Sequence, residues 1–232
     1  MKKAKANLVF IFVLVVLLGS NSVSCAQESK IKLPEPELRG NVSVEEAIHR
    51  RRSVRSFADT PLSLGQVSQL LWAAGGKTVD GVTGPTRAYP SAGAVYPLEI
   101  YLVAGDVTGL DAGIYRYSWD DSSLVLVKKG DVRDELMGAT LGQRMVARAP
   151  VTIVVTMFSD KIMGAYGKRG LERYVSMDAG HLGQNVHLQA EGMRLGTVMV
   201  GAFNDREVAK VLGIKTGKET PIYMMPVGVP LK

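Results

Sequence analysis

The sequence contains a single cysteine, Cys25, and only three histidines among its 232 residues. One thiol cannot form an intramolecular disulfide, so no disulfide framework stabilises this fold. The histidines form no metal-binding pair beside a carboxylate pattern, and the sequence therefore predicts no metal site. It also contains no Walker-type phosphate loop and no serine nucleophile elbow. These absences argue against a metalloenzyme, a P-loop nucleotidase and a serine hydrolase.

Long hydrophobic runs are also absent, apart from one at the N-terminus. Three lysines precede an apolar run from Leu8 to Leu18, which small polar residues follow. This order is typical of a secretory signal, and the run is shorter than the roughly 20 residues that span a bilayer. We expect residues 1–26 to be an export signal, cleaved after Ala26 or at a lipid-modified Cys25; an uncleaved anchor or a buried helix is the remaining alternative. The expected location is the periplasm or cell envelope, with membrane attachment in the lipidated case.

Outside this segment the chain also carries little excess of one charge. The chain has 28 basic and 22 acidic residues, and three of the lysines lie in residues 1–26, so the remainder has a net charge of +3. Such a small excess is not the footprint of a nucleic-acid binder. We therefore predict no nucleic-acid partner. The basic residues are instead local, because His49 and four arginines fall within residues 49–55.

Capping and turn signals divide the rest of the chain into helices and strands of one α+β domain, residues 42–232, after a linker at residues 27–41. Ser43 and Ser63 each open a capping box, and Gly75-Gly76 ends the second helix. Apolar residues three or four apart predict one long helix from Tyr174 to Leu195. The other expected elements are strands at 99–104, 113–118, 124–128, 151–158, 197–200 and 222–227, and helices at 131–139 and 204–212.

The first candidate site is the cluster Arg51, Arg52, Ser53 and Arg55, directly after a short helix. Arginines and a hydroxyl presented two residues apart on an extended segment can form a fork that binds phosphate. A solvated basic helix end is an alternative interpretation, since cations are favourable near the C-terminal end of a helix dipole.

Two further segments combine small residues in a way that suits close approach to a ligand. Gly201 and Ala202 lie between an expected strand and a capped helix, where their amides could face a flat ring. A simple β–α loop explains this segment equally well, and a tight turn before the strand at Glu99 is the alternative for the other segment. The other segment consists of Pro90, Ser91, Ala92, Gly93 and Ala94.

In this order the segments resemble the nitroreductase family, and within it the SagB-type dehydrogenase branch. The resemblance runs from about Val44 to Val229, nearly the whole chain after the signal. Each motif is weak alone, but five in the right order form a specific pattern. The motifs are Arg51-Arg52-Ser53-Val54-Arg55-Ser56-Phe57, the run from Pro90 to Glu99, Gln143 before Ala149-Pro150, Asp178-Ala179-Gly180-His181 with Gln184-Asn185, and Met225-Pro226-Val227-Gly228.

The resemblance implies FMN as cofactor, a nitroreductase-like fold with a mainly antiparallel central sheet flanked by helices, and a homodimer with active sites at the subunit interface. It implies that Arg51, Ser53 and Arg55 hold the FMN phosphate and ribityl oxygens, whereas the side chain of Arg52 can point away. The segment Ser91–Ala94 would reach the flavin from the partner subunit.

The same resemblance implies roles for three more positions. Gly201 and Ala202 would offer amides near flavin N5, and Gln143 would hydrogen-bond the ring or the ribityl chain. The long helix would pack at the dimer core, where Gly180 and Gly183 permit close approach.

The implied activity is hydride transfer from NAD(P)H through the flavin to a small acceptor such as a nitroaromatic or a quinone, with no obligatory catalytic side chain. The alternatives are an exported flavin-binding protein without NAD(P)H turnover and an enzyme fed by another electron donor. Azoline-oxidising members of the branch have a Lys-Tyr pair where this chain has Ala165-Tyr166. The missing lysine argues against azoline oxidation.

Overall fold

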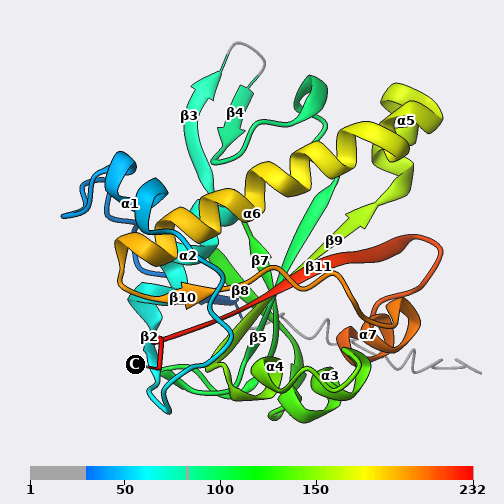
Figure 1. Cartoon of the computed structure of the whole chain (residues 1–232). Coiled ribbons are helices and arrows are strands. Elements are labelled where there is room, and N and C mark those ends of the chain that lie inside the picture. Colours follow the sequence, from blue (N-terminus) through cyan, green and yellow to red (C-terminus); the bar gives the residue numbers. More distant parts are fainter. Residues whose placement is uncertain (1–29, 82–83, 232) are drawn as a thin grey trace, which may run out of the picture.

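A seven-stranded antiparallel sheet forms the centre of the computed structural model, which describes residues 30–81 and 84–231 (Figure 1). The strand order is β1-β8-β7-β5-β9-β11-β10, and every neighbouring pair is antiparallel. This confirms the expected α+β class and nitroreductase-like architecture. The strands of the sheet are β1 (Lys30–Lys32), β5 (Leu98–Ala104), β7 (Gly113–Ser118), β8 (Ser123–Lys129), β9 (Val151–Phe158), β10 (Gly196–Thr197) and β11 (Glu219–Gly228).

Alternating side chains of the central strands supply two separate cores, one on each face of the sheet. On β5, Ile100 and Leu102 enter one core, whereas Tyr101 and Val103 enter the other. Successive residues of a strand point to opposite faces, so a strand that is apolar at every position must be covered on both sides. The helices provide that cover.

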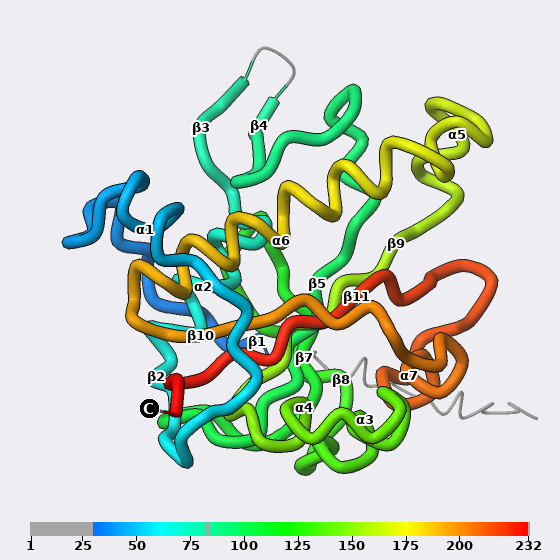
Figure 2. Tube along the Cα trace, viewed as in Figure 1, coloured from blue at the N-terminus to red at the C-terminus, as the bar shows by residue number. Residues whose placement is uncertain are grey.

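The helices α2 (Leu64–Gly75) and α6 (Val175–Gly192) pack on one face of the sheet. The helices α3 (Arg133–Ala139), α4 (Arg144–Arg148) and α7 (Asp205–Leu212) pack on the other, as Figures 1 and 2 show. The short helix α1 (Val44–Arg50) contacts the C-terminal part of α6. The remaining elements are the two-stranded pairs β2 (Leu62–Ser63) with β6 (Val107–Thr108) and β3 (Lys77–Gly81) with β4 (Gly84–Arg87), the 3₁₀ turn η1 (Ala92–Ala94), the helix α5 (Ser159–Arg169) and the π-helical turn η2 (Gly170–Tyr174).

Local capping determines where several helices begin. The Ser63 hydroxyl accepts a hydrogen bond from Gln66 N, and the Gln66 side chain accepts one from Ser63 N, so the predicted capping box is complete. Ser43 accepts from Glu46 N and caps α1. Asn204 accepts from two of the free amides in the first turn of α7, those of Arg206 and Glu207. These three helix starts are confirmed.

The expected linker at residues 27–41 contributes to the folded domain between Lys30 and Pro34. Lys30–Lys32 pairs with β8 as an edge strand, and Leu33 is buried in the core. The Ser68 hydroxyl donates to the carbonyl oxygen of Pro34 at 2.5 Å, which ties the following residues to α2. Strand pairing with a distant partner overrides the extended, proline-containing pattern that suggested a tether.

The structure contains several helices and strands that the sequence did not predict. The hairpin β3–β4, the helices α4 and α5, and the strand β1 were not anticipated, and the expected strand at 197–200 is only β10 followed by an isolated bridge at Val200. Within residues 30–81 and 84–231, no helix is long and apolar enough to cross a membrane. The predicted export signal lies outside the described residues.

Candidate functional site

The segment Arg51–Arg55 lies beside β10, as the trace in Figure 2 shows. Arg51 N caps α1 by donating to Ala47 O at 2.9 Å, and Val54 N donates to Thr197 O at 2.9 Å. The contact is close because Gly196 has no side chain; a Cβ there would come within 2.6–2.8 Å of the Val54 side chain. The structure therefore joins the first predicted site segment to the strand that leads to Gly201.

The charged side chains of this segment face outward. Arg52, Ser53 and Arg55 are exposed and Arg51 is half-buried, and none of the three arginines forms an ion pair with an acidic residue in the described part of the chain. In an extended segment four residues span about 13 Å, so Arg51 and Arg55 are too far apart to hold one small group between them. Arg51 lies near His187 of α6, whereas Arg55 lines a cavity next to α4.

Gly201 and Ala202 follow directly on the same stretch of chain. The bridge between Val200 and Met224 fixes the end of this stretch through two backbone hydrogen bonds of 2.8 and 3.0 Å. Gly201 and Ala202 are exposed, and within residues 30–81 and 84–231 their backbone N–H groups have no hydrogen-bond acceptor. Two adjacent free donors on a fixed backbone can bind an electron-rich ring edge or an anion.

The structure also brings Gln143 to this point, 59 residues away in sequence. Its amide nitrogen donates to Ala202 O at 2.8 Å and to Thr140 O at 3.0 Å. Both amide hydrogens are therefore used within the chain, so the side-chain oxygen alone can contact a ligand. Gln143 thus positions the Gly201–Ala202 loop, in addition to the ligand contact expected from the sequence.

The segment Pro90–Ala94 is held elsewhere, by one face of α6. The Ser91 hydroxyl donates to Asp178 Oδ2 at 2.5 Å, and Ala92 N donates to Asp178 Oδ1 at 3.3 Å. His181 and Asn185 contact the same region from the same face of α6, because His181 Nδ1 lies 3.3 Å from Pro90 O and Asn185 donates to Ala88 O at 2.8 Å. The polar residues of α6 therefore position this loop.

Asp178 is the most buried of these polar groups, with 2% of its surface exposed. Burial raises the pKa of its carboxyl group, because removal from water disfavours the charged form; the hydrogen bonds from Ser91 and Ala92 act in the opposite direction. Ser91 also accepts a hydrogen bond from Tyr96 N at 2.9 Å. The carboxylate and the hydroxyl thus fix both ends of the loop.

The backbone of this loop adopts rare left-handed angles, and Tyr166 packs closely against it. Gly93, Ala94 and Tyr96 have φ values of 57°, 54° and 48°, in the left-handed region that non-glycine residues seldom occupy. The Tyr166 hydroxyl of α5 occupies the space that a side chain on Gly93 would need. Tyr166, which the sequence alone did not place in the site, therefore lies against the predicted ligand-binding loop.

The two halves of the predicted site are separated along α6. Asp178 holds the Pro90–Ala94 loop, and His187 lies near Arg51; nine residues of helix between them correspond to about 14 Å. Arg51–Arg55, Gln143 and Gly201–Ala202 thus form one group, and Pro90–Ala94 forms a second. One chain does not bring both groups around a single phosphate.

Two cavities lie near these groups. The larger, about 750 Å³, lies between residues 34–44, α2 and the C-terminal half of α6, and contains none of the predicted site residues. The smaller, about 380 Å³, is lined by Arg55 and by two arginines of α4, Arg144 and Arg148. Arg144 directly follows Gln143 and lies four residues before Arg148. That spacing indicates a shared helix face only where a helix is predicted, and none was predicted here.

Gly183 has a different role from the one expected for it at a subunit interface. A Cβ at this position would approach Met199 to 2.8 Å and the Tyr223 hydroxyl to 3.2 Å, both within the same chain. Gly183 is buried, whereas Gly180 is exposed with open space beside it. Close packing inside the subunit therefore requires Gly183, and only Gly180 remains available for contact with another subunit.

His187 provides a test of the charge near Arg51. Burial, and to a lesser degree the Arg51 charge, lowers the His187 pKa from 6.5 to about 4. Between pH 6.5 and about 4 the His187 imidazole takes up a proton in the unfolded chain but not in the folded one. The stability that the folded state gains from a neutral His187 is therefore fully present above about pH 6.5 and is lost as the pH falls toward 4. The loss should amount to about 1–3 kcal/mol after allowance for solvent screening.

Urea unfolding of wild type, His187→Gln and His49→Gln at about pH 7 and about pH 4.5 measures this loss. We expect a smaller drop in unfolding free energy for His187→Gln than for wild type, and an unchanged drop for His49→Gln, because His49 is exposed. Equal drops in all three proteins would show that His187 titrates normally in the folded state.

Comparison with known proteins identifies the family. The structure shows an antiparallel sheet covered by helices on both faces, with an exposed arginine segment beside two free backbone amides. The sequence model of the Nitroreductase family matches residues 48–229. A protein of Methanocaldococcus jannaschii named as a nitroreductase is 41% identical over 199 residues, which cover 86% of this chain and 96% of the relative. The chain therefore belongs to the nitroreductase family.

Solved structures give the same result for the fold. A crystal structure from Ralstonia eutropha described as a nitroreductase has a TM-score of 0.75 and 29% identity, covering 88% of this chain and 90% of that one. A second, from Desulfovibrio desulfuricans and described as a nitroreductase in complex with FMN, has a TM-score of 0.60 and 21% identity, covering 82% and 87%. The second likeness supports the fold alone.

Proposed function

We propose that this protein transfers hydride or electrons from NAD(P)H to a small acceptor such as a nitroaromatic or a quinone. Membership of the nitroreductase family makes it an FMN-dependent oxidoreductase. The donor, the acceptor and the finer assignment to the SagB-type branch are our proposal. They are supported by the order of motifs in the sequence and by the arrangement of the site.

The residues present fit FMN. One observation carries this conclusion: the unpartnered N–H groups of Gly201 and Ala202 lie on the same stretch of chain as β10, against which the unpaired arginine segment packs. Free amides suit the electron-rich edge of a flavin ring, and an unpaired guanidinium suits its phosphate. Arg51 and Ser53 would hold the phosphate and the ribityl hydroxyls, with Arg55 farther along the molecule.

FMN, when bound, supplies the hydride chemistry. The chain itself supplies position and charge: Gly201 and Ala202 present amides, Gln143 fixes their loop through Ala202 O, and the exposed Arg55 adds a cation on the segment that packs beside β10. Fixed donors and a cation favour the negative charge that develops on reduction, without any rearrangement of the protein. No side-chain nucleophile is required.

A homodimer would unite the two halves of the site. The Pro90–Ala94 loop lies about 14 Å along α6 from Arg51 within one chain, so the loop of a second subunit would complete the cofactor site. The helix offers a surface for this contact, because Met177, Gly180 and Gln184 form an exposed stripe on one face. Export, with Cys25 either removed or lipidated, remains part of the proposal.

Anaerobic reduction of the purified protein tests this function. We expect a yellow protein whose flavin absorbance bleaches on addition of NADH or NADPH and recovers with a nitroaromatic or quinone. Heat-released cofactor should co-migrate with FMN. A colourless protein that cannot be reconstituted with FMN would overturn the proposal. A yellow protein that bleaches with dithionite but with neither nicotinamide would instead identify a flavoprotein that uses another donor or none.

A further inference from the structure

The cavity beside α4 has an unusual lining. Its lining residues are Arg55, Ser56, Phe57, Asp59, Arg144, Met145, Arg148 and Leu231, so three cations face one carboxylate. Its volume of about 380 Å³ lies within the range of small-molecule sites. A cavity of this size with a net positive lining can accept an anionic group.

The three arginines are free to bind such a group. Arg55, Arg144 and Arg148 are all exposed, and none has an ion-pair partner within residues 30–81 and 84–231, although Asp59 lines the same cavity. Arg144 and Arg148 are four residues apart on one helix, where like charges repel and slightly destabilise the helix. No ion pair of Arg144 or Arg148 offsets this repulsion among the described residues, and a bound anion would.

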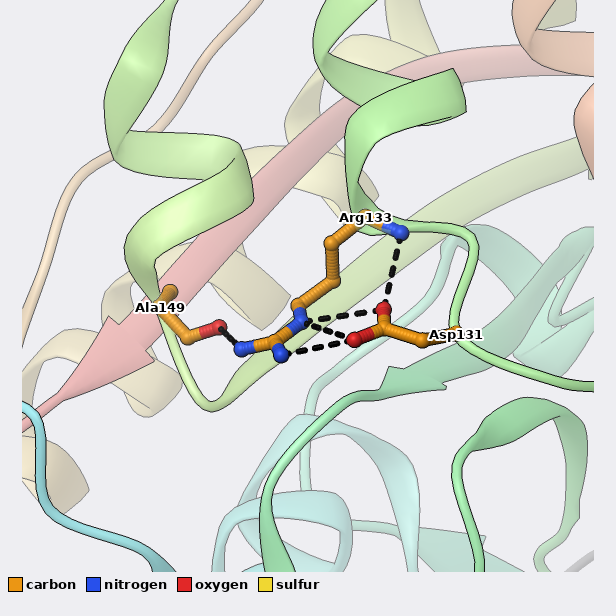
Figure 3. Close-up of polar contacts among 3 residues, drawn as sticks. All are labelled: Asp131, Arg133 and Ala149. Carbon is orange, nitrogen blue, oxygen red and sulfur yellow. Dashed lines mark hydrogen bonds and ion pairs between the residues drawn. The ribbon is translucent and has the colours of Figure 1, made fainter.

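A neighbouring arginine shows the contrast. Arg133, at the start of α3, donates to both carboxylate oxygens of Asp131 and to Ala149 O, as Figure 3 shows. Its ion pair with Asp131 is 2.7 Å long. Arg133 is thus neutralised, and it holds the end of α4 in place through Ala149. The unpaired arginines therefore project from a fixed helix.

The cavity also lies next to the proposed flavin site. Gln143, which contacts Ala202 O, immediately precedes Arg144, and Arg55 belongs to the segment assigned to the cofactor. A small molecule placed against Gly201 and Ala202 would therefore have the arginines of α4 beside it. The two parts share Arg55, but Arg144 and Arg148 lie outside the cofactor motifs.

We propose that Arg144 and Arg148 bind an anionic substituent, a carboxylate or a phosphate, on a substrate that reacts at the flavin. This inference rests on the proposed function. The anion could belong to the acceptor or be the extra phosphate of NADPH, and the chemistry of recognition is the same: guanidinium groups donating to charged oxygens.

The probes are para-nitrobenzoate and its neutral methyl ester, tested on flavin-loaded wild type, Arg144→Gln/Arg148→Gln and the control Arg116→Gln. Arg116 is exposed on β7, which contributes no site residue. Binding to the oxidised protein is followed without a donor, through the change in flavin absorbance. The double variant should bind para-nitrobenzoate roughly tenfold or more weakly. The affinity of the double variant for the methyl ester should fall by a factor at least five times smaller. The control variant Arg116→Gln should bind both compounds as wild type does.

A second arm compares kcat/KM for NADPH and NADH. Loss of NADPH preference in the double variant, with unchanged discrimination between the two nitro compounds, would identify the donor phosphate as the anion and support the site. Equal effects on charged and neutral ligands in both arms would overturn the inference. So would a tenfold loss of FMN affinity with unchanged discrimination, since the arginines would then hold the cofactor. A wild-type protein that binds no FMN contradicts the proposed function instead.

Discussion

Replacing Arg51 and Arg55 together by glutamine should raise the dissociation constant of FMN by about two orders of magnitude. Each charge-assisted hydrogen bond contributes roughly 1.5–3 kcal/mol, and the exposure of these side chains reduces that figure. Even about 1.4 kcal/mol for each arginine corresponds to tenfold per substitution. Neither arginine has an ion-pair partner among the described residues, so their removal leaves no acidic group unpaired.

The single variants separate the two roles. Arg51 should contact the phosphate, so Arg51→Gln should lose affinity for FMN but little for riboflavin, which lacks the phosphate. Arg55 lies about 13 Å farther along the extended segment, so Arg55→Gln should weaken both ligands. Fluorescence titration of flavin-free protein measures these constants, with Arg116→Gln as the control. FMN affinity that is unchanged in the double variant would mean that the phosphate binds elsewhere.

Local signals in the sequence were sufficient to predict several of the regular elements. Ser63 with Gln66 and Asn204 with Glu207 are contacts between residues three apart, and such contacts depend on local sequence only. The face shared by Asp178, His181 and Asn185 also follows directly from helical periodicity. The strand at 151–158 is recognisable because its side chains are apolar on both faces.

Contacts between distant segments were not predictable in the same way. The pairing of Ser53 with Thr197 and of Gln143 with Ala202 depends on the course of the whole chain. Helix α4 has five residues, too few to show a period, so Arg144 and Arg148 could not be placed on one face. Nor does the sequence reveal that Arg133 is neutralised by Asp131 while its neighbours on α4 are not.

The separation of the predicted site into two groups is the clearest example. Five ordered motifs indicated one cofactor, but they carried no information on which motifs lie together in one subunit. The structure places Arg51–Arg55 with Gly201–Ala202, and it attaches Pro90–Ala94 to the N-terminal half of α6. A second subunit that brings the two groups together is therefore part of the proposal for the cofactor site.

Asp178→Ala should therefore impair the protein in two ways. The buried carboxylate accepts from the Ser91 hydroxyl and from Ala92 N, and hydrogen bonds to a charged group contribute roughly 1.5–3 kcal/mol each. Its removal leaves both donors without an acceptor. We expect a loss of about 2–4 kcal/mol in unfolding free energy, measured by urea unfolding of the flavin-free protein at neutral pH.

The second effect should reach the cofactor through the loop. Gly93, Ala94 and Tyr96 hold left-handed backbone angles, and a conformation of that kind persists only while its surroundings enforce it. Without Asp178 the loop should relax, and FMN affinity should fall by roughly tenfold, with a changed flavin circular-dichroism spectrum. Asp178→Asn keeps one acceptor oxygen and should recover part of both losses, whereas Glu191→Ala on the same helix should leave both quantities unchanged. An Asp178→Ala protein that loses stability but binds FMN with wild-type affinity and spectrum would show that Asp178 serves the fold alone, and that the Pro90–Ala94 loop does not touch the flavin.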